Sequence, residues 1–396
     1  MPIKEESFRI GCGRYIQGKG YINRCLDEVK NLGNTPLLIG DTTSLSITRD
    51  ILTKNLDGNT NKFEFITHDG TCEEQRAKEI ACYAAENGFD VFIGIGGGVI
   101  MDFVKLCAYF AKIPVINIPT SSATCAAYTP LSIRYTPDGK TVGSIHYSYE
   151  VDAVICDTEI IAGQPKRLLV AGVFDALAKF VEIKQRFRED MQEYTMGLDY
   201  AYVMAKRAYN VLTEKTKKCI EDIENNIISD DVENVIFICI AIAGVISGVA
   251  RGSNQTALGH KFYETTKFLF PEESKPYLHG EIVGIGLLLQ NHFNGEEENN
   301  AFLVELMKEY NMPYSVTSLG ISKNNSNFDA YYEKLCNSSA IDKDNKSECE
   351  RLKESLSYLW GIYNDCFRSM ERLYKACKNF REFIFYRSPC GFYTSD

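Results

Sequence analysis

The sequence predicts an α/β N-terminal region with a parallel Rossmann-like sheet, followed by an all-α C-terminal region. Two observations predict this architecture. Between about residues 35 and 160, short β-rich runs alternate with helical stretches, which is typical of a parallel sheet covered on both faces. After about Pro165, long segments with helical periodicity take over. A chain of 396 residues is long for one core, so we place a domain boundary between residues 162 and 163.

The first region contains four predicted strands, at residues 36–39, 63–67, 91–95 and 115–118. A helix is expected from about Cys72, where Thr71 and Glu74 could form a capping box, and a second helix at 99–111. The turn residues between Tyr135 and Lys140 predict a projecting hairpin. This alternation supports the parallel sheet.

In the second region, helical periodicity predicts helices at residues 168–185, 196–212, 232–250, 282–291 and 298–310. Residues 322–350 are rich in Asn, Ser, Asp and Lys, which favours exposed loops between helices. The aromatic residues of 380–393 are expected to pack on these helices.

Composition excludes several classes of protein. A formal charge of −10 argues against a nucleic-acid partner, since such proteins usually carry a basic face. The apolar run at 235–250 is shorter than the ~20 residues of a bilayer span, which favours a buried core helix and no membrane insertion. No apolar stretch follows the first charged residues, and the 14 cysteines form no Cys-x-x-Cys pair. We therefore expect a cytoplasmic protein with reduced thiols.

A glycine-rich turn follows the predicted strand at 91–95 and comprises Gly94, Gly96, Gly97 and Gly98. Glycines allow close approach of a diphosphate, and the amides of the following helix favour anionic oxygens. The spacing differs from Gly-x-Gly-x-x-Gly, and a simple tight turn is the alternative interpretation. Asp41, after an earlier strand, could bind an adenosine ribose or could cap a helix.

Three further residues suggest a metal site. Asp175 lies in a predicted helix, His260 follows Gly259, and His279 precedes an apolar helix. One carboxylate and two imidazoles leave coordination positions free, as in a catalytic metal site. The alternatives are a solvated ion pair between Asp175 and Lys179, four residues later, and histidines that are satisfied core residues.

These same segments resemble the glycerol dehydrogenase and iron-containing alcohol dehydrogenase family. The resemblance covers about residues 10–320 and includes the glycine turn with Asp102 and Lys105, Pro119-Thr120, and the three metal segments in the right order. It implies the fold of that family, also shared by dehydroquinate synthase, with a nucleotide-binding domain at 1–162 and a helical metal-binding domain at 163–396. It also implies an NAD(P)-linked oxidoreductase that interconverts a small alcohol and its carbonyl compound.

The resemblance implies a set of cofactor and metal residues. NAD or NADP would contact Asp41, Gly97, Gly98, Val99, Ile100, Met101, Asp102, Thr120, Ser121, Thr129, Leu131 and Tyr135. One divalent metal would be held by Asp175, His260 and His279. Relatives with four metal ligands carry a histidine where this chain has Lys179, so zinc is favoured over iron.

The substrate is left open between a polyol and a 2-hydroxy acid. Cys125 stands where glycerol dehydrogenases carry a polyol-binding aspartate, and residues 124–132 are similar to the hydroxycarboxylate dehydrogenase branch. Loss of a carboxylate there would favour an anionic substrate. Two other hypotheses remain: a non-redox lyase of the dehydroquinate synthase type, and an inactive binding homologue. Homo-oligomerisation is also open.

Overall fold

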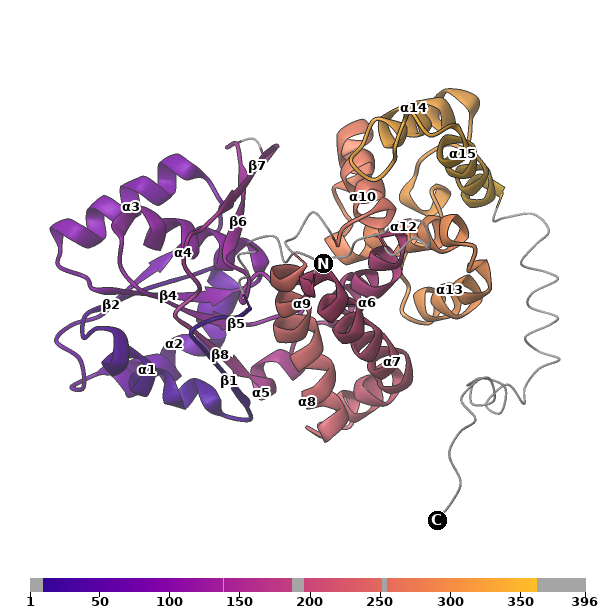
Figure 1. The fold of residues 1–396 in the computed structure, drawn as a ribbon. Helices are drawn as coiled ribbons and strands as arrows, with labels where there is room; N and C mark the ends of the chain where they lie inside the picture. The colour runs from indigo at the N-terminus through magenta and orange to yellow at the C-terminus, as the bar shows by residue number, and fades with distance from the viewer. Residues whose placement is uncertain (1–9, 138, 187–195, 251–254, 362–396) are drawn as a thin grey trace, which may run out of the picture.

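The computed structural model describes residues 10–137, 139–186, 196–250 and 255–361. Figure 1 shows an N-terminal half that contains the sheet and a C-terminal half made of helices. The predicted fold class is confirmed. The predicted contribution of residues 380–393 lies outside the described residues.

The N-terminal half is a parallel sheet in the order β1-β8-β5-β4-β2-β3. Its elements are β1 (Arg14–Gly18), η1 (Tyr21–Arg24), α1 (Cys25–Leu32), β2 (Pro36–Gly40), α2 (Thr42–Leu56), β3 (Glu64–Thr67), α3 (Glu74–Glu86), β4 (Val91–Gly96), α4 (Gly98–Ala111), β5 (Val115–Pro119), β8 (Ala153–Asp157) and α5 (Thr158–Ala162). A separate antiparallel hairpin consists of β6 (Leu131–Tyr135) and β7 (Thr141–His146), as predicted, although Asp138 of its turn lies outside the described residues.

Both faces of the sheet are buried, which explains why its strands are almost wholly apolar. Leu37 and Ile39 of β2 pack in the cluster that includes α3 and α4. Leu38 points to the opposite face, where α1 and α2 pack. Figure 1 shows these two helix pairs on opposite sides of the sheet.

The direction of the chain through the sheet changes between β2 and β4. From β2 the chain goes to β3 at one edge, and then crosses back to β4 and β5 on the other side of β2. In open parallel sheets, ligands bind outside the carboxyl ends of the strands at such a point. The ends of β2, β4 and β5 are level, because Gly40 pairs with Ile95 and Gly96 pairs with Pro119.

The C-terminal half is helical in its described part. Its elements are α6 (Lys166–Arg186), α7 (Met196–Glu224), α8 (Asp230–Phe237), the π-helical η2 (Ile238–Ile242), α9 (Ala243–Val249), α10 (Leu258–Leu269), α11 (Pro271–Ser274), α12 (His279–Asn294), η3 (Glu297–Asn299), α13 (Asn300–Glu309), η4 (Thr317–Leu319), α14 (Asn325–Cys336) and α15 (Lys346–Gly361).

Two local features differ from the predictions. The helix expected from about Cys72 is present and begins at Glu74, but the expected capping box between Thr71 and Glu74 is absent from the described residues, because the Cys72 carbonyl accepts the backbone N–H of Tyr135 at 3.0 Å and holds the chain extended. Residues 322–350, expected to be loops, contain α14 and the start of α15. There, Asn324 caps α14 by accepting the N–H of Asn327 at 2.8 Å, and Tyr331 and Leu335 are fully buried, so packing outweighs a polar composition.

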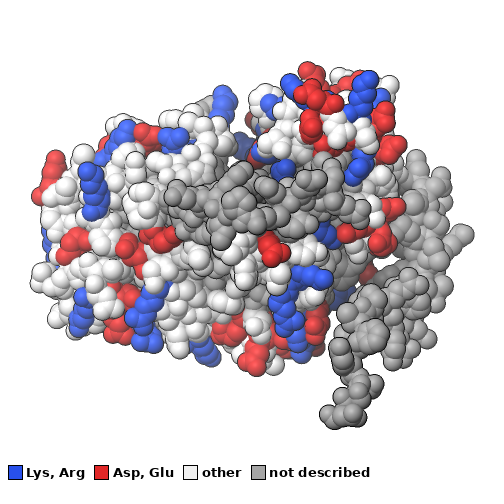
Figure 2. Space-filling view, viewed as in Figure 1, with Lys and Arg blue, Asp and Glu red and all other residues white. Residues whose placement is uncertain are grey.

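In the described part of the chain, one helical stretch, from Asp230 to Val249, has the length and composition of a membrane span, with a mean hydropathy of 2.2. A single such stretch is weak evidence for a membrane, and 61% of it is buried inside the protein. Burial agrees with the expected core helix. Figure 2 shows cationic and anionic side chains interspersed over the face in view, unlike the basic face of a nucleic-acid binder.

Candidate metal centre and cofactor edge

The three predicted metal residues lie together. One ligand atom from each of Asp175, His260 and His279 falls within 4.8 Å of the others. Oδ1 of Asp175 lies 3.3 Å from Nε2 of His260 and 3.4 Å from Nε2 of His279. This oxygen is buried and accepts no hydrogen bond from the residues that the structure describes. A buried carboxylate oxygen without a donor, facing two imidazole nitrogens, suits a metal ion.

Close helix packing brings the three residues together from α6, α10 and α12. Asp175 is in the buried middle of α6, while His279 is the first residue of α12. A Cβ added at Gly280 would lie 1.8 Å from the carbonyl oxygen of Ala171, so only glycine allows α12 to approach α6 this closely. The carboxylate of Glu281 then accepts the N–H of Leu278 and pairs with Arg167, which fixes the start of α12.

Glu182 supports His260 and was not anticipated from the sequence. Its carboxylate is fully buried, accepts the backbone N–H groups of Ala257 and His260, and lies 2.5 Å from Nδ1 of His260. A carboxylate on Nδ1 directs the Nε2 lone pair of the imidazole toward a metal. The available signal was spacing, since Glu182 lies seven residues after Asp175 and therefore on the same face of α6.

The charged groups at the centre shift one another's pKa values. Burial raises the pKa of the Asp175 carboxyl, but Lys179 and the two imidazoles outweigh it and hold this pKa well below 3.8. Burial lowers the pKa of His260, whereas Glu182 and Asp175 raise it, with a net value of about 9. The site thus favours an ionised aspartate and a cation beside it.

Lys179 lies one turn after Asp175 and is 5% exposed. Its Nζ is 3.8 Å from Oδ1 of Asp175, so the two residues form only a long ion pair, which is buried and not solvated as the alternative interpretation expected. The pKa of Lys179 is lowered by burial but raised more by Asp175, Cys125 and Glu182, so that it lies above its usual 10.5.

The segment that follows β5 lies against the metal centre. A Cβ at Gly172 of α6 would lie 1.9 Å from the carbonyl oxygen of Ser122, so the two backbones are in direct contact. Cys125, the predicted substrate residue, is partly buried and lies close enough to Lys179 and Asp175 for their charges to affect the pKa of its thiol. Burial raises the pKa of its thiol, which is neutral at physiological pH. The sheet and the helical half therefore meet at this segment.

Asp41, Thr120 and Ser121 lie at the carboxyl edge of the sheet. Asp41 caps α2: Oδ1 accepts the N–H of Ser44 at 2.9 Å and Oδ2 accepts its hydroxyl at 2.6 Å. The Ser44 hydroxyl is also 3.0 Å from that of Thr120. Asp41 therefore caps a helix, which was the alternative interpretation of this residue. Each of its carboxylate oxygens retains a lone pair that could accept a hydrogen bond from a ribose.

The glycine turn connects β4 to α4 at the point where the chain changes direction. Gly97 is the N-cap of α4 and provides no side-chain cap, so the first amides of this helix remain available for an anion. Gly98 lies against Thr124, since a Cβ there would be 2.9 Å from its hydroxyl oxygen. Of the next residues, Val99 is exposed, whereas the Ile100 and Met101 side chains are buried and could offer a ligand only backbone atoms.

Asp102 and Lys105 form a buried pair that positions the segment before the hairpin. Asp102 accepts the N–H of Ile133 at 3.0 Å and lies 3.0 Å from Nζ of Lys105. Nζ of Lys105 donates to the carbonyls of Ala126, Thr129 and Leu131. The Asp102 carboxylate is therefore engaged within the protein, and this pair holds Thr129 and Leu131 in place.

Tyr135, at the end of β6, links the hairpin to the metal centre. Burial raises the pKa of its phenol, and the nearby Tyr263 raises it further. The Tyr263 ring packs edge-on against His279, with ring centroids 4.3 Å apart. Tyr135 therefore lies near a ring that packs on the metal centre.

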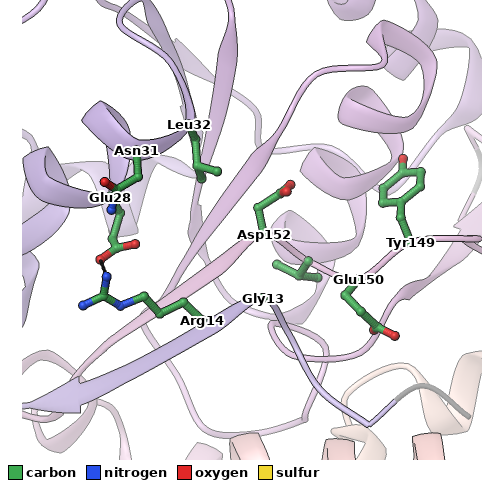
Figure 3. A pocket seen from close by; sticks show the side chains of 9 residues that line it. Gly13, Arg14, Glu28, Asn31, Leu32, Tyr149, Glu150 and Asp152 are labelled. Atoms are coloured by element: carbon green, nitrogen blue, oxygen red, sulfur yellow. Dashed lines mark ion pairs between the residues drawn. The ribbon is translucent and has the colours of Figure 1, made fainter.

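A separate cavity of about 440 Å³ lies at the opposite, amino edge of the sheet (Figure 3). It is lined by Gly13, Arg14, Glu28, Asn31, Leu32, Tyr149, Glu150, Val151 and Asp152. Arg14 pairs with the buried Glu28 at 3.2 Å. None of the predicted site residues lines this cavity, and parallel sheets bind ligands at the other edge.

Comparisons with known proteins agree with this geometry. The family model for iron-containing alcohol dehydrogenase matches residues 12–158. A glycerol dehydrogenase of Thermotoga maritima is 32% identical over 287 residues, which cover 70% of this chain and 74% of that one. Hydroxycarboxylate dehydrogenase A of Escherichia coli is 30% identical over 262 residues, 65% of this chain and 70% of that one.

The chain belongs to the iron-containing alcohol dehydrogenase family. It is an oxidoreductase that acts on a small alcohol, and the family implies a nicotinamide cofactor and a divalent metal. The crystal structure of glycerol dehydrogenase from Schizosaccharomyces pombe shares the fold, with a TM-score of 0.79, 19% identity and 94% coverage of each chain. These relatives are dehydrogenases, and nothing in them favours the lyase hypothesis.

Proposed function

We propose that Asp175, His260 and His279 hold one divalent metal, with zinc preferred over iron. The observation that carries this proposal is the buried, donor-free Oδ1 of Asp175 facing two Nε2 atoms. The centre offers three ligands, since the residue one turn after Asp175 is a lysine, which remains protonated and cannot coordinate. The buried Glu182 supports the tautomer of His260 that a metal needs.

The nicotinamide dinucleotide, NAD or NADP, binds in this proposal at the carboxyl edge of the sheet. The uncapped start of α4 at Gly97 and Gly98 accepts the diphosphate, and Asp41 contacts the ribose. Thr120 and Ser121 line the same edge. Thr129, Leu131 and Tyr135 lie toward the nicotinamide, on the segment that reaches the metal centre. For Ile100, Met101 and Asp102, only backbone or indirect contributions are proposed, because they are buried or paired within the protein, whereas the exposed Val99 can also offer its side chain.

The reaction interconverts a small alcohol and its carbonyl compound. The alcohol is a polyol or a 2-hydroxy acid. A metal supplies Lewis-acid polarisation of the substrate oxygen, and the nicotinamide ring accepts or gives the hydride. The chain's own residues orient these groups: Glu182 holds His260, Glu281 fixes the helix that begins at His279, and Cys125 adds a neutral thiol beside the centre.

The proposal is tested by loading metal-free protein with zinc, or anaerobically with ferrous iron, and following reduced-nicotinamide absorbance. The substrates are glycerol, dihydroxyacetone, 2-oxoglutarate and 2-oxobutanoate, each with NAD(H) and NADP(H). Asp175→Asn should lose bound metal and at least about 100-fold in turnover together, since the loss of a ligand exceeds the usual effect of a supporting residue. Full activity of this variant with metal retained would refute the assignment.

Three broader features belong to the same proposal. The domain boundary lies after residue 162, where α5 ends. A cytoplasmic location is supported by the 11 free cysteines of the described residues. A homo-oligomer is testable by sedimentation of the purified protein.

A further inference from the structure

Lys179 is a buried cation without a hydrogen bond in the described part of the chain. Among the described residues, its Nζ forms one ion pair, the 3.8 Å contact with Oδ1 of Asp175. The other buried lysine of this region, Lys105, donates to three carbonyl groups and pairs with Asp102 at 3.0 Å. A buried ammonium is costly unless its donors are used. The donors of Lys179 therefore remain available beside the metal centre.

The oxygen that pairs with Lys179, Oδ1 of Asp175, is also the oxygen that faces the two imidazoles of the proposed metal site. Oδ1 of Asp175 lies closer to the two imidazoles, at 3.3 and 3.4 Å, than to the ammonium. A metal held by the trio would take this oxygen as its ligand. Lys179 would then need another anion to compensate its charge inside the protein.

The charges around the centre lead to the same conclusion. Asp175 and Glu182 contribute two negative charges, and Lys179 contributes one positive charge. A divalent metal with neutral imidazoles brings the total to one net positive charge. Cys125 adds no charge, because burial raises the pKa of its thiol. One negative charge on a bound molecule would balance the centre.

We propose that Lys179 binds the carboxylate of a 2-hydroxy or 2-oxo acid whose adjacent hydroxyl or carbonyl oxygen lies at the Asp175, His260 and His279 site. This inference rests on the proposed function and selects the substrate class within it. In oxidation, the C2–H bond breaks, its hydride reduces the nicotinamide, and the hydroxyl proton is released as the carbonyl forms. The carboxylate is unchanged and serves only for recognition. Lys179 thereby distinguishes acids from neutral alcohols.

The test compares a 2-oxo acid with its neutral amide. Zinc-loaded enzyme is assayed with NADH on 2-oxobutanoate, 2-oxobutanamide and dihydroxyacetone, as wild type and as Lys179→Met and Lys179→Gln. We expect both variants to lose about 10- to 100-fold in kcat/KM for the acid, the range of a hydrogen bond to a charged group, and to change little on the amide. Lys184→Met is the matched control, because Lys184 is on the same helix but pairs with Glu296.

A second measurement does not depend on turnover. Calorimetric titration of 2-hydroxybutanoate into zinc-loaded protein with NADH gives acid binding without reaction, and each Lys179 variant should bind about 10- to 100-fold more weakly with its zinc content unchanged. Equal losses on acid and amide, or loss of zinc, would overturn the inference. So would wild-type protein that turns over only neutral substrates. Absence of any cofactor turnover would instead contradict the proposed function, and the titration would still decide the role of Lys179.

Discussion

At the scale of single residues, the carboxylate of Glu182 determines how His260 is presented. It accepts two backbone N–H groups and the Nδ1 side of the imidazole, and it is fully buried. Glu182→Gln keeps the shape but removes the charge, so zinc affinity should fall about 10- to 100-fold, the usual effect of residues that support a ligand. Competition with a chromogenic chelator measures this change. Glu28→Gln, another buried carboxylate but at the amino edge of the sheet, should leave zinc affinity as in wild type.

His260 also determines how metal uptake depends on pH. In the metal-free protein its pKa is about 9, because Glu182 and Asp175 outweigh the effect of burial. This raised pKa stabilises the metal-free fold below pH 6.5, and the stabilisation is lost as pH rises through about 9. Zinc must displace the proton, so apparent zinc affinity should rise about tenfold per pH unit between pH 6 and 8. Calorimetry in buffers of different ionisation enthalpy measures the released proton. A pH-independent affinity would contradict the raised pKa.

At the scale of elements, the position of α12 against α6 depends on Gly280. An alanine Cβ would lie 1.8 Å from the Ala171 carbonyl oxygen, and a backbone atom cannot move aside as a side chain can. Gly280→Ala should therefore reduce the free energy of unfolding by about 1–3 kcal/mol or more, as overpacking does, and should displace His279. Urea unfolding of the metal-free protein and zinc titration measure the two effects. Gly361→Ala is the control, because no atom of the described residues lies within 4 Å of its added Cβ.

The elements that the sequence predicted correctly are those whose pattern is local. Buried parallel strands such as β2 and β4 are short apolar runs, and α6 has a long helical periodicity. The errors occurred where distant contacts decide. The start of α3 depends on the bond from Tyr135, sixty-odd residues along the chain, to the Cys72 carbonyl. Similarly, α14 is polar in sequence and is stabilised by burying Tyr331 against α10.

In the candidate site, too, residues in local motifs could be predicted, whereas residues whose role depends on distant contacts could not. Asp175, His260 and His279 could be selected because each lies in a motif that resembles a known family, and the structure brings them together. The roles of Glu182 and Lys179 could not be selected in this way. Spacing places Glu182 on the face of Asp175, but a buried carboxylate or ammonium in a helix has no sequence signature distinct from a surface ion pair. The roles of Glu182 and Lys179 depend on which side chains of α10 and α12 face α6.

At the scale of the whole molecule, a metal at this centre joins three helices that are far apart in the chain. Removal of zinc by a chelator should abolish turnover, and its return should restore it. Zinc at about 100 times its Kd should stabilise the fold by about 2.7 kcal/mol, because only the folded chain brings the ligands together. At about 2–4 °C per kcal/mol, the melting temperature should rise by several degrees.

Asp175→Asn is the control for this stabilisation, because it keeps the helices and removes the central ligand. Its melting temperature should not respond to zinc, whereas NADH should still stabilise it through the carboxyl edge of the sheet. If zinc stabilised the variant as much as the wild type, the bound metal would lie elsewhere in the chain. If NADH lost its effect as well, the two sites would be coupled through the segment at Cys125, which contacts α6 and follows the sheet edge.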